Sequence, residues 1–221
     1  ISKVKIIALA KRYKDFPKHG MVSSLFDNLS LQLPSILIPK IFSFSISGYF
    51  FFANKIVNLP SALISGSIGQ VYLQKITENK NNGIEIFPIF KNTITKLFFI
   101  ALPITIIGYI TSPYIFPLLF GEKWKISGEI AQYLFLIFII RFCVSPLSNS
   151  FIPALELKKA ALWQYLYFIS SIILFIITLY LKIDLKIFLI FYVIHEYILY
   201  GVYLYFINLA VRKIDINLIR K

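Results

Sequence analysis

Cysteine, histidine and acidic residues are scarce in this sequence of 221 residues. The one cysteine, Cys143, lies inside an apolar run, which excludes an intrachain disulfide. The two histidines are His19 and His195, and no Ser–His–Asp, Cys–His or paired-carboxylate arrangement is apparent. The sequence therefore predicts no metal site, no cofactor and no enzymatic activity.

A signal peptide and long loops are also missing. The chain starts at Ile1, and its only methionine, Met21, follows a basic stretch, so we expect the chain to be part of a longer protein. The longest polar loop expected is 77–86, and the partly apolar segment 111–125 is expected to form an outer loop. Neither could hold a soluble domain, so any function must reside among the apolar segments.

Long apolar runs are what the chain does have. Residues 160–181 carry no charge, and residues 187–211 carry only Glu196. About 20 apolar residues in a helix cross a bilayer core of about 30 Å. Hydrophobic residues make up 58% of the chain and its mean hydropathy is +0.76. The sequence therefore predicts an all-α integral membrane protein.

Six membrane-spanning helices fit the pattern. They form a predicted bundle over residues 21–213, between a juxtamembrane segment, 1–20, and a tail, 214–221, both expected to be cytoplasmic. The prolines inside them are tolerated because neighbouring helices can satisfy the freed carbonyl groups. The predicted helices cover residues 21–42, 46–75, 87–112, 126–155, 160–181 and 187–211.

Basic residues are distributed unequally between the two sides of this predicted bundle. The side with both termini carries 16 Lys and Arg residues and the opposite side carries 4. The positive-inside rule predicts that both termini lie in the cytoplasm. The basic excess also attracts anionic lipid headgroups, and a nucleic-acid partner is not expected. Trp124 and Trp163 fall at helix ends on opposite sides, as interfacial anchors do.

Of the charged residues inside the predicted spans, five are candidates for a role within the bundle. Lys40 lies near a helix end, where its side chain can reach the interface. Lys55 and Arg141 lie deeper, where a charge costs roughly 2.5–3.5 kcal/mol on insertion scales, so we expect them to face a cavity or to pair with Asp27 or Glu196. His195 adjoins Glu196, but helical neighbours project about 100° apart, so we expect a structural role for the histidine.

Polar side chains form a stripe on each of the first two predicted helices. These stripes indicate either the walls of a hydrated substrate cavity or hydrogen bonds between helices. For Ser61, Ser65 and Gly69, small residues four positions apart, we expect close helix packing. With Lys55 and Arg141, the candidate cavity residues are Asp27, Asn28, Gln32, Asn54 and Asn58.

Several phrases, in the right order, resemble the second half of bacterial polysaccharide flippases, members of the multidrug/oligosaccharidyl-lipid/polysaccharide exporter superfamily. The resemblance covers essentially all 221 residues. It implies the C-terminal six-helix lobe of a MATE-like transporter with twelve or more spans, whose N-terminal bundle would be a partner. The phrases are YKDFPK (13–18), SLQLPSILI (30–38), GYFFFANKIVNLPSALISGSIGQVYLQK (48–75), LFGEKWKISGEIAQYL (119–134) and SPLS (145–148).

The resemblance implies transport of a polyprenyl-pyrophosphate-linked oligosaccharide for O-antigen, capsule or exopolysaccharide synthesis. Lys55, in Ala53-Asn54-Lys55, occupies the basic position of the family's Ala-x-Arg/Lys phrase. Two alternatives remain open. A multidrug exporter of the same superfamily would share the fold but favour acidic residues in its cavity. A membrane glycan polymerase would need a large outer loop.

Overall fold

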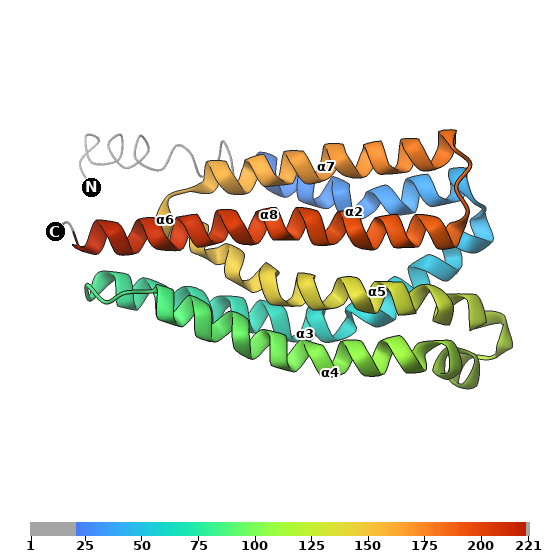
Figure 1. The fold of residues 1–221 in the computed structure, drawn as a ribbon, viewed down its shortest axis with the longest axis horizontal. Coiled ribbons are helices and arrows are strands. Elements are labelled where there is room, and N and C mark those ends of the chain that lie inside the picture. Colours follow the sequence, from blue (N-terminus) through green and yellow to red (C-terminus); the bar gives the residue numbers. More distant parts are fainter. Residues whose placement is uncertain (1–20, 220–221) are drawn as a thin grey trace, which may run out of the picture.

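The computed structural model describes residues 21–219, apart from the side chains of residues 21–24, 27, 62 and 63. The predicted juxtamembrane segment 1–20 lies outside the described residues. Within the described range every regular element is a helix, which confirms the all-α prediction. The helices run along the long axis of the molecule and reverse direction at its two ends (Figure 1).

Six long helices and three short ones follow one another within residues 21–219. The loop between α3 and α4 and the C-terminal end of α8 lie at one end of the molecule, and the α2–α3 and α7–α8 turns lie at the other (Figure 1). The elements are α2 (Met21–Ile41), α3 (Phe44–Asn81), α4 (Phe87–Phe120), the 3₁₀ helix η2 (Glu122–Trp124), α5 (Lys125–Val144), the 3₁₀ helix η3 (Ser145–Ser150), α6 (Phe151–Ala154), α7 (Leu157–Tyr180) and α8 (Leu185–Ile219).

Five helical segments in the described chain are long and apolar enough to cross a membrane, as expected for a multi-pass membrane protein. The helix α2, which carries Asn28, Gln32 and Lys40, is not one of the five. The helix α8 continues through the first part of the predicted tail. The five segments are Phe44–Asn81, Phe87–Phe120, Glu122–Ala154, Leu157–Tyr180 and Leu185–Ile219.

The structure corrects two predicted loops. The loop predicted at 77–86 shortens to 82–86, because α3 continues to Asn81. The outer loop predicted at 111–125 is helical through Phe120, despite two prolines in its last turns. Packing explains the second error, since the rings of Phe116 and Phe120 contact Phe52 of α3 at centroid distances of 5.9 and 4.9 Å.

The fourth predicted span is also not one continuous helix. The helix α5 ends at Val144 and the chain then forms η3. Pro146 has no N–H to continue the α-helical pattern. This break places Asn149 against α3, where its Nδ2 donates a 2.9 Å hydrogen bond to the Gly69 carbonyl. A Cβ on Gly69 would lie 2.8 Å from that nitrogen, which confirms the predicted packing role of this glycine.

Small residues bring α4 and α5 into close contact along much of their length. A Cβ on Gly128 would lie 2.5 Å from the carbonyl oxygen of Ser112. A Cβ on Gly108 would lie equally close to the ring of Phe135. Small side chains at these crossings allow the backbones to approach, as they commonly do in membrane bundles. The pairing of α4 with α5 therefore depends on the absence of a side chain at both glycines.

Trp163 is buried rather than interfacial. Its exposed fraction is 2%, and its ring stacks on Tyr203 at 3.8 Å between centroids. The indole Nε1 donates a 2.7 Å hydrogen bond to the Leu199 carbonyl of α8. The prediction of an interfacial anchor was therefore wrong for Trp163, because α8 covers it. Trp124 lies half-buried in η2, with its ring against Phe52.

Two acidic residues fasten the end of the bundle that carries the C-terminus. The buried carboxylate of Asp215 in α8 accepts hydrogen bonds from the backbone N–H groups of Ile86 and Phe87, at 2.8 and 3.0 Å. These bonds satisfy donors at the start of α4. Glu156, between α6 and α7, pairs with Lys213 of α8 and with Lys159. The N-terminal ends of α4 and α7 are therefore both bound to α8.

Candidate functional site

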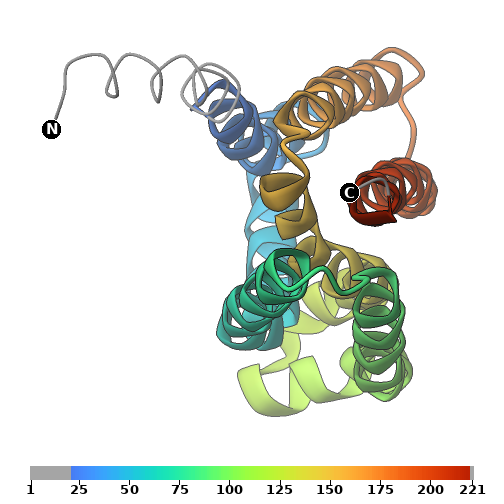
Figure 2. The ribbon, with the colours of Figure 1, turned by 90° about the vertical axis from the view of Figure 1, so that its left-hand side faces the viewer.

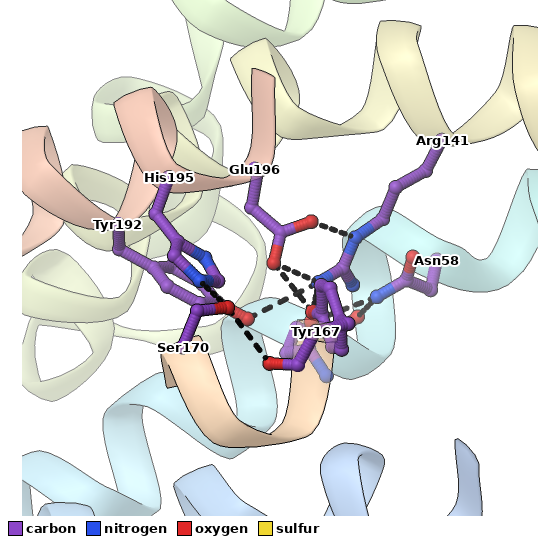
Figure 3. A network of polar contacts seen from close by, with 8 residues as sticks. Asn58, Arg141, Tyr167, Ser170, Tyr192, His195 and Glu196 are labelled. Atoms are coloured by element: carbon purple, nitrogen blue, oxygen red, sulfur yellow. Dashed lines mark hydrogen bonds and ion pairs between the residues drawn. The ribbon is translucent and has the colours of Figure 1, made fainter. Parts of the chain in front are cut away.

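A buried ion pair joins α5 to α8. The Arg141 Nε donates to one carboxylate oxygen of Glu196 and Nη2 donates to the other, both at 2.7 Å (Figure 3). The Glu196 side chain is fully buried and that of Arg141 is 18% exposed. Two parallel charge-assisted bonds are the strongest way for these groups to meet. From the sequence, Arg141 was expected either to face a cavity or to pair with an acidic residue. The structure shows it paired with Glu196.

Two tyrosine hydroxyls complete the surroundings of this pair. Tyr167 of α7 donates a 2.5 Å hydrogen bond to Glu196 and accepts one of 2.9 Å from Arg141. The Tyr192 hydroxyl accepts a further bond of 3.2 Å from Arg141. The guanidinium also lies over the ring of Tyr200, 5.9 Å from its centroid. A buried charge pair is tolerated when further hydrogen bonds serve its donors and acceptors, and the hydroxyls of Tyr167 and Tyr192 provide such bonds here.

His195 lies beside the cluster but outside the ion pair. Its Nε2 is 2.8 Å from the hydroxyl of Ser170, and Ser170 in turn donates to the Tyr167 carbonyl. Since that serine proton is used, Nε2 is the donor in the first contact. Glu196 accepts a bond from the hydroxyl of Tyr167, whereas His195 contacts the ring of Tyr167 (Figure 3). The side chains of His195 and Glu196 therefore project in different directions, as expected.

The position of Lys55 contrasts with that of Arg141. Lys55 lies in α3, about 16 Å along the helix from its first residue, Phe44. Its side chain is exposed, and in the part of the chain that the structure describes it makes no ion pair. The predicted alternative pairing with Glu196 does not form, since Arg141 occupies that carboxylate. Among the side chains that the structure describes, which do not include the other expected partner, Asp27, Lys55 is thus a cation without an acidic partner on the outside of this bundle.

Polar groups accompany Lys55 on α3. The Asn58 amide donates 2.8 Å hydrogen bonds to the backbone carbonyl and the side-chain oxygen of Asn54, and both residues are half-buried. These bonds run within one helix rather than between helices. The exposed residues on this face of α3 recur about once per helical turn and are both polar and apolar. They include Gly48, Phe51, Lys55, Leu59, Gly66, Gln70 and Gln74.

The helix α2 contributes polar groups at a comparable depth. Asn28 and Gln32 are exposed, and Ser35 donates a 3.4 Å hydrogen bond to the Gln32 side chain. Counted from the α2–α3 turn, Gln32, Asn28 and Lys55 lie roughly 15–22 Å along their helices. The side chain of Asp27 lies outside those described. The helices α2 and α3 also pack against each other, so these groups belong to one side of the bundle.

The exposed faces of α7 and α8 differ from this polar face. Along the middle of α7 every exposed residue is aliphatic, as expected for contact with lipid. These residues are Leu162, Leu166, Ile169, Ile173, Ile176 and Ile177. On α8 the corresponding exposed residues are apolar or aromatic, namely Ile187, Ile190, Phe191, Ile194, Tyr197 and Ile198. The side formed by α2 and α3 also exposes apolar residues such as Leu31 and Phe51, but it adds Asn28, Gln32, Asn54, Lys55 and Asn58 and is therefore the candidate site.

Metal coordination does not explain these groups. Among the residues that the structure describes, no three of His, Cys, Asp and Glu lie close enough together to hold a metal ion. The sequence located the candidate residues but not Tyr167 and Tyr192, because tyrosines are too frequent here for two of them to stand out. The nearest signal was the pair of charges, Arg141 and Glu196, within otherwise apolar runs.

Comparison with known families identifies a relationship for the first part of the chain. The model of a family described as polysaccharide biosynthesis protein matches residues 5–129, more than half of the chain. This match contains α2, α3, α4 and every polar candidate on them, and it ends before Arg141. Searches of curated proteins and of solved structures each find no match. The chain belongs to the polysaccharide biosynthesis protein family.

Proposed function

We propose that the protein is a flippase that moves a polyprenyl-pyrophosphate-linked oligosaccharide across the bacterial inner membrane. The family relationship gives a role in polysaccharide biosynthesis. The multi-pass architecture favours transport as the step performed. The observation that carries the proposal is the exposed Lys55, about 16 Å from the start of α3, which makes no ion pair among the described residues. The products served would be O-antigen, capsule or exopolysaccharide.

The positive charge of Lys55 is the reason for proposing a substrate with an anionic head group. An ammonium group in contact with lipid tails is costly, so its surroundings must supply water or a negative charge. The head of a polyprenyl-pyrophosphate glycan carries phosphate and, often, acidic sugars. Asn54 and Asn58 beside it offer amide groups for sugar hydroxyls, as do Asn28 and Gln32 on α2. In this proposal the polar side of α2 and α3 forms one wall of a hydrated cavity.

A second bundle of helices would form the opposite wall. Transporters of this kind bind substrate near the middle of the membrane between two bundles, and rocking of one bundle against the other alternates access. The polar groups on the side of α2 and α3, which the apolar middle part of the exposed face of α7 lacks, support this placement. The N-terminal bundle of the same protein is the proposed partner, and the ion pair of Arg141 and Glu196 would keep this lobe rigid.

The alternative of a multidrug exporter for cations receives less support. Such a transporter needs carboxylates on its cavity surface. In the described part of the bundle, the most deeply buried acid, Glu196, is neutralised by Arg141. The exposed charge nearest to the polar candidates of α3 is the cation Lys55. An anionic substrate therefore fits the site better than a cationic one.

Deletion of the gene in its host tests the proposal. Loss of a flippase predicts that lipid-linked oligosaccharide accumulates on the cytoplasmic leaflet while surface glycan disappears. The full protein should restore export, and the full protein carrying Asn54→Leu and Asn58→Leu together should restore less. Exchange of the lipid-facing Ile173→Leu serves as the control. Unchanged surface glycan without accumulation of the intermediate would contradict the proposal.

A further inference from the structure

A groove opens between α3 and α4 near the end of the bundle that carries the 82–86 loop. It has a volume of about 410 Å³. Viewed from that end, the two helices stand apart and the loop bridges them (Figure 2). Its lining is Ser67, Ile68, Val71, Tyr72 and Lys75 of α3 and Ile89, Asn92, Thr93, Lys96, Leu97 and Ile100 of α4.

The separation of these consecutive helices has a structural cause. The helix α4 packs on α5 through Gly108 and Gly128, whereas α3 packs on α5 and η3. The carboxylate of Asp215 also holds the start of α4 toward α8, by bonds to the first residues of that helix. The helix α4 is thus fixed to its other neighbours, and its contact with α3 is slight. The groove is built into the fold rather than left by a missing loop.

The groove is cationic toward one end and apolar toward the other. Lys75 is six residues from the end of α3, about 9 Å along the helix, and Lys96 is nine residues into α4, about 14 Å along. Long lysine side chains at such depths extend toward the interface. Ile68 and Ile100 lie farther from the loop and continue the walls toward the middle of the membrane. This order, with charge outermost and hydrocarbon innermost, is that of a phospholipid.

Both lysines are available to a ligand. Neither makes an ion pair or hydrogen bond among the described residues, and both side chains are exposed. The acid nearest to Lys75 in sequence, Glu78, accepts a 2.8 Å hydrogen bond from Gln74 instead. The hydroxyl of Tyr72 is occupied by Ser150, so Asn92, Thr93 and Ser67 are the other polar residues of the lining, and Asn92 and Thr93 lie within one turn of Lys96.

We propose that this groove binds one anionic phospholipid of the leaflet that lies on the side of the chain termini. Lys75, Lys96 and Asn92 hold the headgroup phosphate, and one acyl chain lies along Val71 and Ile100. Basic pockets between membrane helices are recognised sites for anionic headgroups. The apolar walls favour a lipid over a soluble phosphate, because they bury hydrocarbon that a soluble ion lacks. The lipid fills the space between α3 and α4 and is distinct from the transported substrate.

Native mass spectrometry of the full chain in detergent measures this binding directly. The probes are phosphatidylglycerol, zwitterionic phosphatidylcholine, glycerol phosphate and a polyprenyl phosphate. One variant carries Lys75→Gln and Lys96→Gln, and its charge-matched control carries Lys182→Gln and Lys186→Gln at the opposite end of the bundle. A further variant, Val71→Trp, fills the groove without changing its charge. Thermal melting without added lipid checks that each variant is folded.

We expect one tightly retained phosphatidylglycerol and weaker retention of phosphatidylcholine. Loss of both lysines should weaken phosphatidylglycerol binding about thirtyfold, given the usual contribution of each basic residue near the surface. Val71→Trp should also release the lipid, and the control should retain it. Equal binding of the two phospholipids, or wild-type binding by the lysine variant, would overturn the proposal. Displacement by glycerol phosphate, or stronger binding of polyprenyl phosphate, would overturn the assignment to a phospholipid.

Discussion

Arg141 and Glu196 lie 55 residues apart in the chain and form a two-point ion pair between α5 and α8. Tyrosine hydroxyls around them bond to Arg141 Nη2 and to Glu196. The two charges therefore neutralise each other within the lobe. We propose different roles for Arg141 and Lys55, with Arg141 structural and Lys55 available for binding.

Breaking one side of this ion pair should destabilise the fold more than removing both charges. Glu196→Ala leaves the guanidinium buried without a counter-charge, at a cost of about 3–5 kcal/mol. Arg141→Met combined with Glu196→Leu should recover much of that loss, because apolar groups of similar size can replace a buried pair. Melting temperatures in detergent, followed by size-exclusion chromatography, compare the variants. Equal losses in the single and double variants would argue against a structural pair.

The close approach of α4 and α5 leads to a second prediction. Gly128→Ala places a methyl group against the backbone of Ser112, so we expect a loss of about 1–3 kcal/mol from overpacking. Gly201→Ala in α8 provides a matched control, because no atom lies within 4 Å of its added Cβ. Better helix propensity should leave that control neutral or slightly stabilised. The melting temperatures of the Gly128→Ala and Gly201→Ala variants test this prediction. An unchanged melting temperature for Gly128→Ala would show that α4 and α5 can move apart to accept the methyl group.

Acid should weaken the contact between the start of α7 and the end of α8. Burial raises the pKa of the Glu156 carboxyl, but the contacts from Lys213 and Lys159 lower it more, and the pKa lies below its ordinary value of 4.5. A carboxyl with a lowered pKa stabilises the folded state above that ordinary value. Its contribution is lost as the pH falls through the lower, folded-state pKa.

Melting curves recorded from neutral pH to well below pH 4.5 test this linkage. Glu156→Gln should lower the melting temperature at neutral pH and make the decline on acidification less steep than in the wild-type protein. Glu129→Gln, an exposed acid at the other end of the bundle, serves as the control. If the wild-type and Glu156→Gln curves run parallel, Glu156 does not contribute in this way.

The orientation in the membrane remains a prediction, and the structure provides a pair of labelling sites. Ser45 and Asn82 are exposed at opposite ends of α3. In protein carrying Cys143→Ser, a single cysteine at position 45 should react with an impermeant thiol reagent outside intact cells. A cysteine at position 82 should react only after permeabilisation. The reverse pattern would contradict cytoplasmic termini.

Much of the fold could be predicted from the sequence, because long runs without charge indicate helices that cross a membrane. The runs at 160–181 and 187–211 became α7 and α8, each with small extensions. Helix ends were less predictable. The segment 111–125 was expected to be a loop, but aromatic contacts from α3 to Phe116 and Phe120 hold its first part in a helix. Pro146 was expected within one span, yet it begins the 3₁₀ segment that separates α5 from α6.

The candidate site was predictable only as a list of residues. An unpaired polar or charged residue in an apolar run is conspicuous, so Lys55, Arg141, Asn54 and Asn58 could be selected by composition. Their partners depend on the crossing of distant helices. No local pattern distinguishes Tyr167 from the other tyrosines, and none indicates that Glu196 faces Arg141 rather than Lys55. Trp163 was wrongly predicted to be an interfacial anchor for the same reason. The sequence of α7 does not indicate that α8 covers this residue.

Transport by Lys55 variants tests the central claim most directly. Lipid-linked oligosaccharide from a strain lacking the gene is reconstituted into vesicles with the full protein, and its appearance on the opposite leaflet is followed. Lys55→Arg should keep most of the transport, whereas Lys55→Gln should lower it at least about tenfold, the usual effect of losing a bond to a charged group. Lys40→Gln, near the end of α2, should transport normally. Wild-type transport by equally folded Lys55→Gln protein would contradict the account.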